Sequence, residues 1–191
     1  MKKYETFKPI QDNFKNLRDQ ICNNFENIEK SLSNGSNIKL KPGKFKKTKW
    51  DRTPDKGYKS GGGGIMSIMY GRVFEKVGVN ISTVYGSFSD EMKKSVPGAE
   101  KNPSFYATGI SVVAHMHSPL IPAAHFNTRF ISTSKSWFGG GTDITPVSIE
   151  KSKAISKKFH LDLKNTCDTH NKNYYPKFKK WCDEYFYLPH R

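Results

Sequence analysis

Three histidines and an arginine lie close together in the segment "SVVAHMHSPLIPAAHFNTRF", residues 111–130. Imidazole rings transfer protons near neutral pH or bind divalent metals, and an arginine fork holds a carboxylate by two hydrogen bonds. If this segment forms strands, His115 and His117 share one face, and His125 and Arg129 also share a face. This segment could therefore transfer protons, bind a metal or bind a carboxylate. The simpler alternative is that the histidines are structural and the arginine forms an ordinary salt bridge.

The segment "SWFGGGTDITP", residues 136–146, places three glycines just before a lone acid, Asp143. Three successive glycines leave a bare backbone that a flat ligand can approach closely, with the carboxylate presented to N–H donors of that ligand. A tight turn between two strands is an equally open explanation of the glycines. Neither this cluster nor "SGGGG" at residues 60–64 matches a phosphate-binding loop, so the pattern argues against a nucleotide site.

The composition indicates one folded domain with a basic surface. The chain has 191 residues, of which 35% are hydrophobic and 13% aromatic, enough to build a core. The net charge of +15 fits a generally basic surface, a polyanionic small substrate or a nucleic acid. Most aromatic residues stand at periodic positions typical of buried packing, so we expect no nucleic-acid partner and keep a nucleic-acid-binding module as the alternative.

The cellular compartment is indicated by the cysteines and by the apolar segments. Cys22, Cys167 and Cys182 have no metal-binding spacing, and we interpret them as reduced thiols of a cytoplasmic protein. No apolar run approaches the roughly 20 residues that cross a bilayer, so we expect no membrane span. The first residues are charged and periodic, which does not resemble a signal peptide.

The elements that must position these side chains follow from the spacing of apolar residues. A stripe with three- and four-residue steps predicts a long helix over residues 7–32, and β-branched and aromatic residues predict strands after it. The further predictions are a strand at 45–50, two or three strands within 65–88, a loop at 89–103, strands at 105–118 and 125–133, and helices over 155–170 and 175–188. The order of helix, strands and helices favours an α+β fold with an antiparallel sheet, and a single domain spanning residues 1–191.

Four segments together resemble a known family. They are "VFEKVGVNISTVYG", "HFNTRF", "WFGGGTDITP" and "YPKFKKWCDEYFYLPHR", and they occur in the family's order between about residue 50 and the end of the chain. They are similar to the oxygen-dependent coproporphyrinogen III oxidases of haem biosynthesis. The resemblance implies conversion of two propionates of coproporphyrinogen III to vinyl groups. Molecular oxygen is the oxidant, and the products are protoporphyrinogen IX, carbon dioxide and hydrogen peroxide.

The resemblance also implies roles for individual residues. Asp143 aligns with the acid that faces the pyrrole N–H donors, and His125 aligns with the histidine assigned as proton donor. Arg129 aligns with an arginine that binds a propionate. The positions that match substrate contacts are Ser111, Asn127, Thr128 and Arg129.

A possible divalent metal is the only cofactor implied beyond O2 as co-substrate, since family members need no organic or redox cofactor. The histidines that align with metal ligands in some bacterial members are His115, His125, His160 and His190. His117 and His170 have no counterpart, and we interpret them as structural.

The family fold implied is a flat antiparallel sheet sandwiched between helices, assembled as a homodimer. The family signature continues beyond the point where this chain stops, at Arg191. We therefore expect a chain that lacks about the last third of the family fold, including a substrate segment and the elements used for dimerisation. On that expectation the isolated chain keeps some tetrapyrrole affinity but has little or no turnover, and a tetrapyrrole-binding remnant is the second alternative.

Overall fold

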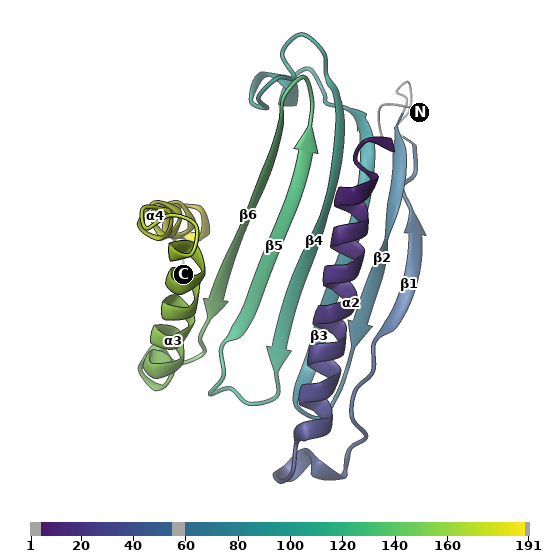
Figure 1. Ribbon diagram of the computed structural model, residues 1–191. Coiled ribbons are helices and arrows are strands. Elements are labelled where there is room, and N and C mark those ends of the chain that lie inside the picture. The colour runs from purple at the N-terminus through teal and green to yellow at the C-terminus, as the bar shows by residue number, and fades with distance from the viewer. Residues whose placement is uncertain (1–4, 55–59, 190–191) are drawn as a thin grey trace.

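The computed structural model describes residues 5–54 and 60–189, and its centre is a six-stranded antiparallel sheet (Figure 1). The sheet order is β1-β2-β3-β4-β5-β6, so each strand pairs with its neighbour in the sequence. The strands are β1 (Lys46–Asp51), β2 (Gly61–Met69), β3 (Phe74–Ser87), β4 (Ser104–Met116), β5 (Ala123–Ser132) and β6 (Ser136–Thr145). The predicted α+β class with a flat antiparallel sheet is confirmed.

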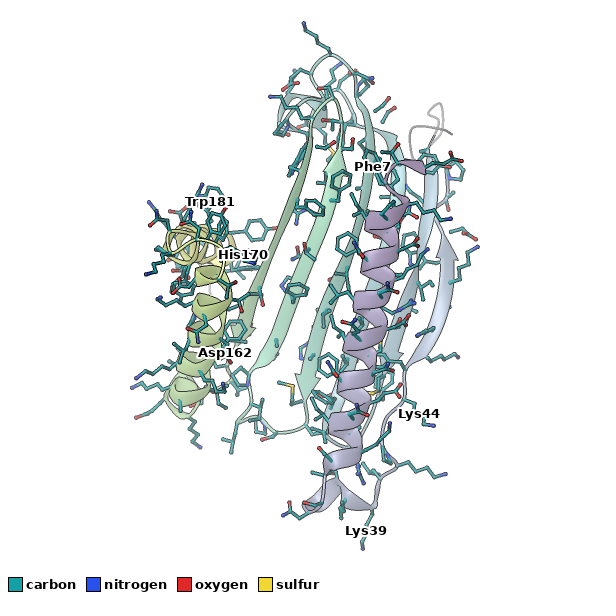
Figure 2. The ribbon with its side chains drawn as sticks, in the orientation of Figure 1. Phe7, Lys39, Lys44, Asp162, His170 and Trp181 are labelled. Atoms are coloured by element: carbon teal, nitrogen blue, oxygen red, sulfur yellow. The ribbon has the colours of Figure 1, made fainter. Side chains whose placement is uncertain are left out.

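Helix α2 (Lys8–Ser31) packs along one face of the sheet, over β3 and β4 (Figure 1). Its apolar stripe faces the sheet, and Phe14 and Cys22 are buried there. Figure 2 shows Phe7 over the sheet at the start of this helix, where its ring centroid lies 5.1 Å from that of Tyr106. The predicted helix over residues 7–32 is therefore confirmed.

Helices α3 (Ile149–Asp168) and α4 (Tyr174–Phe186) stand beside the β6 edge of the sheet (Figure 1). Helix α4 makes contacts with β6. The shorter 3-10 helices are Ser36–Lys39 and Met92–Lys94, and the second lies in the segment predicted as a loop. None of the described helices is long and apolar enough to cross a membrane.

The two faces of the sheet differ because side chains alternate along each strand. On β4, Tyr106, Ile110 and Val112 are buried beneath α2, whereas Ser111 and Val113 point to the opposite side. We call this opposite side the open face. The residues on the open face of the last three strands include Ser111, Val113, His115, His125, Asn127, Arg129, Gly139, Gly141 and Asp143.

A buried carboxylate fastens the end of α2 to the β2–β3 turn. Oε1 of Glu29 accepts hydrogen bonds from the backbone N–H groups of Val73 and Phe74, both at 2.9 Å. Oε2 accepts from the N–H groups of Gly43, at 3.0 Å, and Arg72, at 2.7 Å. The Arg72 guanidinium donates in turn to the Glu29 carbonyl, at 2.7 Å, near the helix C-terminus, where unpaired carbonyls gather.

Both glycine clusters lie inside strands, which the sequence did not predict. Gly139, Gly140 and Gly141 belong to β6 and pair with residues 127–129 of β5, so a tight turn at this point is excluded. Residues 61–64 likewise open β2. Glycine is depleted in strands generally, and its presence inside one often marks a place where another group approaches the backbone closely.

Candidate active site

Four polar side chains form one row on the open face. His125, Asn127 and Arg129 alternate along β5, so all three lie on the same side of the sheet. In the pairing of β5 with β6, His125 stands opposite Asp143. We call Asp143, His125, Asn127 and Arg129 the β5–β6 row.

The members of the β5–β6 row are linked by successive hydrogen bonds. Nδ1 of His125 lies 2.9 Å from Oδ1 of Asp143, and Nε2 of the same ring lies 3.3 Å from Nδ2 of Asn127. A guanidinium N–H of Arg129 donates to Oδ1 of Asn127 at 3.1 Å. The Thr142 hydroxyl donates to the backbone carbonyl of His125 at 2.6 Å and so fixes the register of the two strands. The row therefore joins an acid to a cation through an imidazole and an amide.

Helix α4 shields one side of the imidazole. The Phe186 ring meets His125 edge to face, with centroids 5.8 Å apart and an angle of 82° between the rings. The side chains of His125 and Asp143 keep 29% and 28% of their surface exposed. The pair is therefore partly desolvated, which strengthens its electrostatic interactions, yet a ligand can still reach it.

A cavity of about 910 Å³ lies between the helix pair and the last two strands, near the upper end of the usual range for small-molecule sites. Asp143 and Asn127 border it, together with mainly apolar side chains. Its apolar walls include Phe126, Phe138, Phe159, Leu163, Phe178, Trp181 and Phe186. An apolar cavity beside a few polar groups suits a large, flat organic ligand that carries charged substituents.

The glycines of β6 make room for side chains from other elements. A Cβ atom added at Gly139 would lie 4.0 Å from Cζ of Arg129, whose side chain runs past this position. A Cβ atom at Gly141 would lie 3.6 Å from the Phe186 ring and 3.7 Å from Sγ of Cys182. The bare backbone therefore lets α4 approach the β5–β6 row, and it keeps the surface beside Arg129 flat.

The remaining predicted substrate contacts are divided between the two faces. Ser111 pairs with Asn127 across β4 and β5, and both lie on the open face. Thr128 alternates to the α2 side of β5, and its hydroxyl donates to the Gly139 carbonyl at 3.5 Å. Thr128 nevertheless borders the cavity. Ser111 therefore joins the surface of the β5–β6 row, whereas the Thr128 side chain does not.

The histidines predicted as metal ligands come from different elements. His115 lies on the open face of β4, whereas His160 belongs to α3, where Nδ1 lies 3.1 Å from the Tyr175 hydroxyl. His190 lies outside the described residues. Across residues 5–54 and 60–189, no group of three or more His, Cys, Asp or Glu side chains is placed to hold a metal ion.

Helix α4 also contributes side chains that the sequence did not assign to the site. Tyr185 on this helix is 80% exposed. Cys182 and Phe186 face the site instead. The signal was available in their spacing, because residues four apart lie on one side of a helix.

Comparison with known proteins identifies relatives of the chain. A family model described as "Coproporphyrinogen III oxidase" matches residues 9–191. The oxygen-dependent coproporphyrinogen-III oxidase of Rickettsia africae (strain ESF-5) is 57% identical over 178 residues, which cover 93% of this chain and 60% of the relative. The enzyme of the same name from Rickettsia akari (strain Hartford) is 57% identical over 185 residues, which cover 96% and 63%. The chain thus spans about 60% of the length of these curated relatives.

Proposed function

The chain belongs to the coproporphyrinogen III oxidase family, and on this premise we propose that its protein catalyses the oxygen-dependent oxidative decarboxylation of coproporphyrinogen III. In each step a propionate loses its carboxyl group as CO2 and becomes a vinyl group, while O2 takes up two hydrogens and leaves as hydrogen peroxide. Two such steps give protoporphyrinogen IX. The observation that carries the proposal is the β5–β6 row, because its acid and its guanidinium suit the pyrrole N–H groups and the carboxylates of this substrate.

Arg129 is proposed to hold a propionate. Among the described residues its guanidinium makes one side-chain hydrogen bond, to Asn127, and Arg129 is an exposed residue. A planar fork with free donors can bind a carboxylate by two hydrogen bonds, which fixes the orientation as well as the position of the substrate. The flat glycine backbone opposite Arg129 leaves space for the macrocycle.

Asp143 and His125 are proposed to act on the macrocycle as a pair. Oδ1 of Asp143 is engaged by His125, and none of the hydrogen bonds among the described residues uses Oδ2. Oδ2 is therefore available to accept a pyrrole N–H. The paired imidazole can accept or donate a proton beside it, and a fixed negative charge in a partly dry site stabilises positive charge that develops on the substrate.

Further properties are proposed from the resemblance. They are a single domain over residues 1–191, a homodimeric assembly and a cytoplasmic location, the last supported by three free cysteine thiols. A divalent metal has weaker support, because the described residues do not bring His115, His125 and His160 together as a ligand set. No step proposed here passes through a metal.

A chimaera tests the function without depending on the length of this chain. The segment of the Rickettsia africae enzyme that aligns with this chain is replaced by the chain itself, and coproporphyrinogen III is supplied in air. We expect conversion to protoporphyrinogen IX, followed as protoporphyrin fluorescence after oxidation. An inactive chimaera, beside an active Rickettsia enzyme and a normal thermal unfolding transition, would contradict the proposal. Binding of the substrate without conversion would identify the tetrapyrrole-binding alternative.

A further inference from the structure

Four connections of the chain meet at one end of the sheet (Figure 1). The N–H of His117 donates to the Val73 carbonyl at 3.1 Å, and the Asn37 amide donates to the Arg72 carbonyl at 3.2 Å. The pairing of β5 with β6 brings the β6–α3 connection beside the β4–β5 loop. We call these four connections the loop end, and they are residues 32–45, 70–73, 117–122 and 146–148.

Each of the four connections has large apolar side chains exposed on or next to the loop end. Val147 and Ile149 keep 78% and 76% of their surface exposed. The exposed apolar side chains are Ile38, Leu40, Tyr70, Leu120, Ile121, Val147 and Ile149. At the opposite end of the sheet, residues 88–103 and 133–135 expose one large apolar side chain, Met92. Scattered apolar residues are ordinary on a surface, but a concentration of them marks a contact surface.

Exposed lysines surround these apolar side chains. Figure 2 shows Lys39 and Lys44 at this end of the molecule. The exposed lysines on or next to the loop end include Lys30, Lys39, Lys41, Lys44, Lys46, Lys76 and Lys151. Among the described residues, the exposed acids within three residues of the loop end are Glu75 and Glu150. By contrast, residues 88–103 balance their acids and lysines, which are Asp90, Glu91, Glu100, Lys93, Lys94 and Lys101.

The cations of the loop end differ in how far they are available to a partner. The Arg72 guanidinium donates to the carbonyls of Lys30 and Leu32, at 3.1 and 3.2 Å, where α2 ends. The side chains of Lys39, Lys41 and Lys44 make no hydrogen bond or ion pair with any described residue. These three lysines are therefore free to bind an anionic partner.

We propose that the loop end docks the protein on an anionic lipid bilayer. Leu120, Ile121 and Val147 enter the boundary between headgroups and acyl chains, and the lysines contact the lipid phosphates. A bilayer fits this surface better than a nucleic acid does, because aliphatic side chains bury among acyl chains but offer bases no ring to stack on. The β5–β6 row lies on the open face of the sheet, and the docking does not depend on the proposed function.

The first test is flotation of the whole chain with vesicles of equal parts phosphatidylcholine and phosphatidylglycerol, beside vesicles of phosphatidylcholine alone. We expect binding to the anionic vesicles that is about tenfold tighter or more, and that weakens as salt is added. A lysine close to an anionic surface is worth about fivefold in affinity. The triple variant Lys39→Gln, Lys41→Gln and Lys44→Gln should therefore lose about a hundredfold.

The matched control removes the same charge from the opposite end, as Lys93→Gln, Lys94→Gln and Lys101→Gln. We expect the control to bind the anionic vesicles within about fivefold of the wild type, because charges more than a Debye length from the bilayer are largely screened. Equal losses in the two triple variants would mean that only the net charge of the protein matters, which would overturn the role of the loop end.

The second test asks whether the apolar side chains enter the bilayer. Leu120→Trp and Met92→Trp each add one indole at an exposed position, at the loop end and at the opposite end. Anionic vesicles with brominated acyl chains should quench the added fluorescence of Leu120→Trp and leave that of Met92→Trp unchanged. The double variant Leu120→Ser and Ile121→Ser should bind about tenfold more weakly or less, since it removes apolar area from the contact.

Every other result would overturn the proposal. No binding, or equal binding to both kinds of vesicle, would exclude an anionic bilayer as the partner. Binding that needs the lysines but leaves Leu120→Trp unquenched would indicate a purely electrostatic contact, of the kind that RNA also makes. Quenching of Met92→Trp as strong as that of Leu120→Trp would show that the chain docks through another surface. Circular dichroism checks that each variant keeps the wild-type fold, and none of these readouts requires turnover.

Discussion

Replacing Glu29 by glutamine should be among the most destabilising single changes that preserve side-chain size in this fold. Glu29 is fully buried, and its two oxygens accept four backbone N–H groups, two on each oxygen. Glutamine keeps one oxygen and turns an NH2 group toward the other two donors. Those two backbone N–H groups then lose their acceptor inside the protein.

The magnitude follows from the number of donors left without a partner. A buried donor without a partner costs about 1–3 kcal/mol, so two of them predict a loss of about 2–5 kcal/mol. For a chain of this size that corresponds to a fall in Tm of roughly 5–15 °C. The matched control is Glu26→Gln, three residues earlier on α2, where Oε1 accepts a single backbone bond from Phe45 at 3.0 Å. We expect the control to lose no more than about 1 kcal/mol.

The effect should also depend on pH. Burial alone raises the pKa of Glu29, but hydrogen bonds from the backbone of Gly43, Phe74, Arg72 and Val73 outweigh it and hold the pKa below its usual value. A lowered folded-state pKa adds stability above the unfolded value of about 4.3, and this stability is lost as the pH falls through the folded value. The difference in the free energy of unfolding between the wild type and Glu29→Gln should therefore become smaller below about pH 4.

The assay is urea unfolding followed by circular dichroism at a series of pH values. The free energy of unfolding should fall with urea concentration at the same slope in the wild type, Glu29→Gln and Glu26→Gln. The midpoints of unfolding then compare the stability of the three proteins directly. The reasoning would be refuted if the Glu29 and Glu26 variants shifted the midpoint equally. It would also be refuted if the difference in stability between the wild type and Glu29→Gln were the same at pH 7 and at pH 3.

Three further predictions concern the site and the thiols. Arg129→Lys keeps the charge but loses the fork, so the affinity for coproporphyrin III should fall toward that of its tetramethyl ester, as measured by fluorescence titration; an unchanged preference for the acid would make Arg129 structural. Gly141→Ala should be tolerated, because its Cβ would sit in ordinary contact 3.6 Å from Phe186, whereas Gly141→Val should push α4 away and cost about 1–3 kcal/mol in thermal unfolding; equal stability of the two variants would contradict this. Burial raises the pKa of the Cys22 thiol to about 11, so alkylation at neutral pH, read by mass spectrometry, should label Cys182 well before Cys22; equal labelling rates would show that Cys22 is accessible.

The sequence predicted the elements whose side chains carry a periodic signal. Helix α2 was predicted because its apolar stripe repeats over seven turns, and β5 because β-branched and aromatic residues alternate there. Strand β6 was missed because Gly139, Gly140 and Gly141 carry no strand signal of their own. Only their pairing with β5 makes them a strand, and that pairing is a tertiary interaction.

Some features of the candidate site could likewise be predicted from the sequence, and others depend on tertiary structure. That His125 and Arg129 share a face follows from strand alternation and could be predicted from the sequence. That Asp143 stands opposite His125 depends on the register between β5 and β6, which residue spacing alone does not determine. The position of Phe186 against His125 depends on how α4 docks at the sheet edge, so it emerges only from the three-dimensional structure.

The central claim is that the β5–β6 row on the open face binds the four-carboxylate tetrapyrrole. The most direct measurement is a crystal structure of the chain with coproporphyrin III, the stable oxidised form that carries the same carboxylates. The account predicts that the macrocycle lies against the glycines of β6, with one propionate on the Arg129 guanidinium and a ring nitrogen facing Asp143. A tetrapyrrole bound on the α2 face, or bound on the open face without contact to either residue, would contradict it.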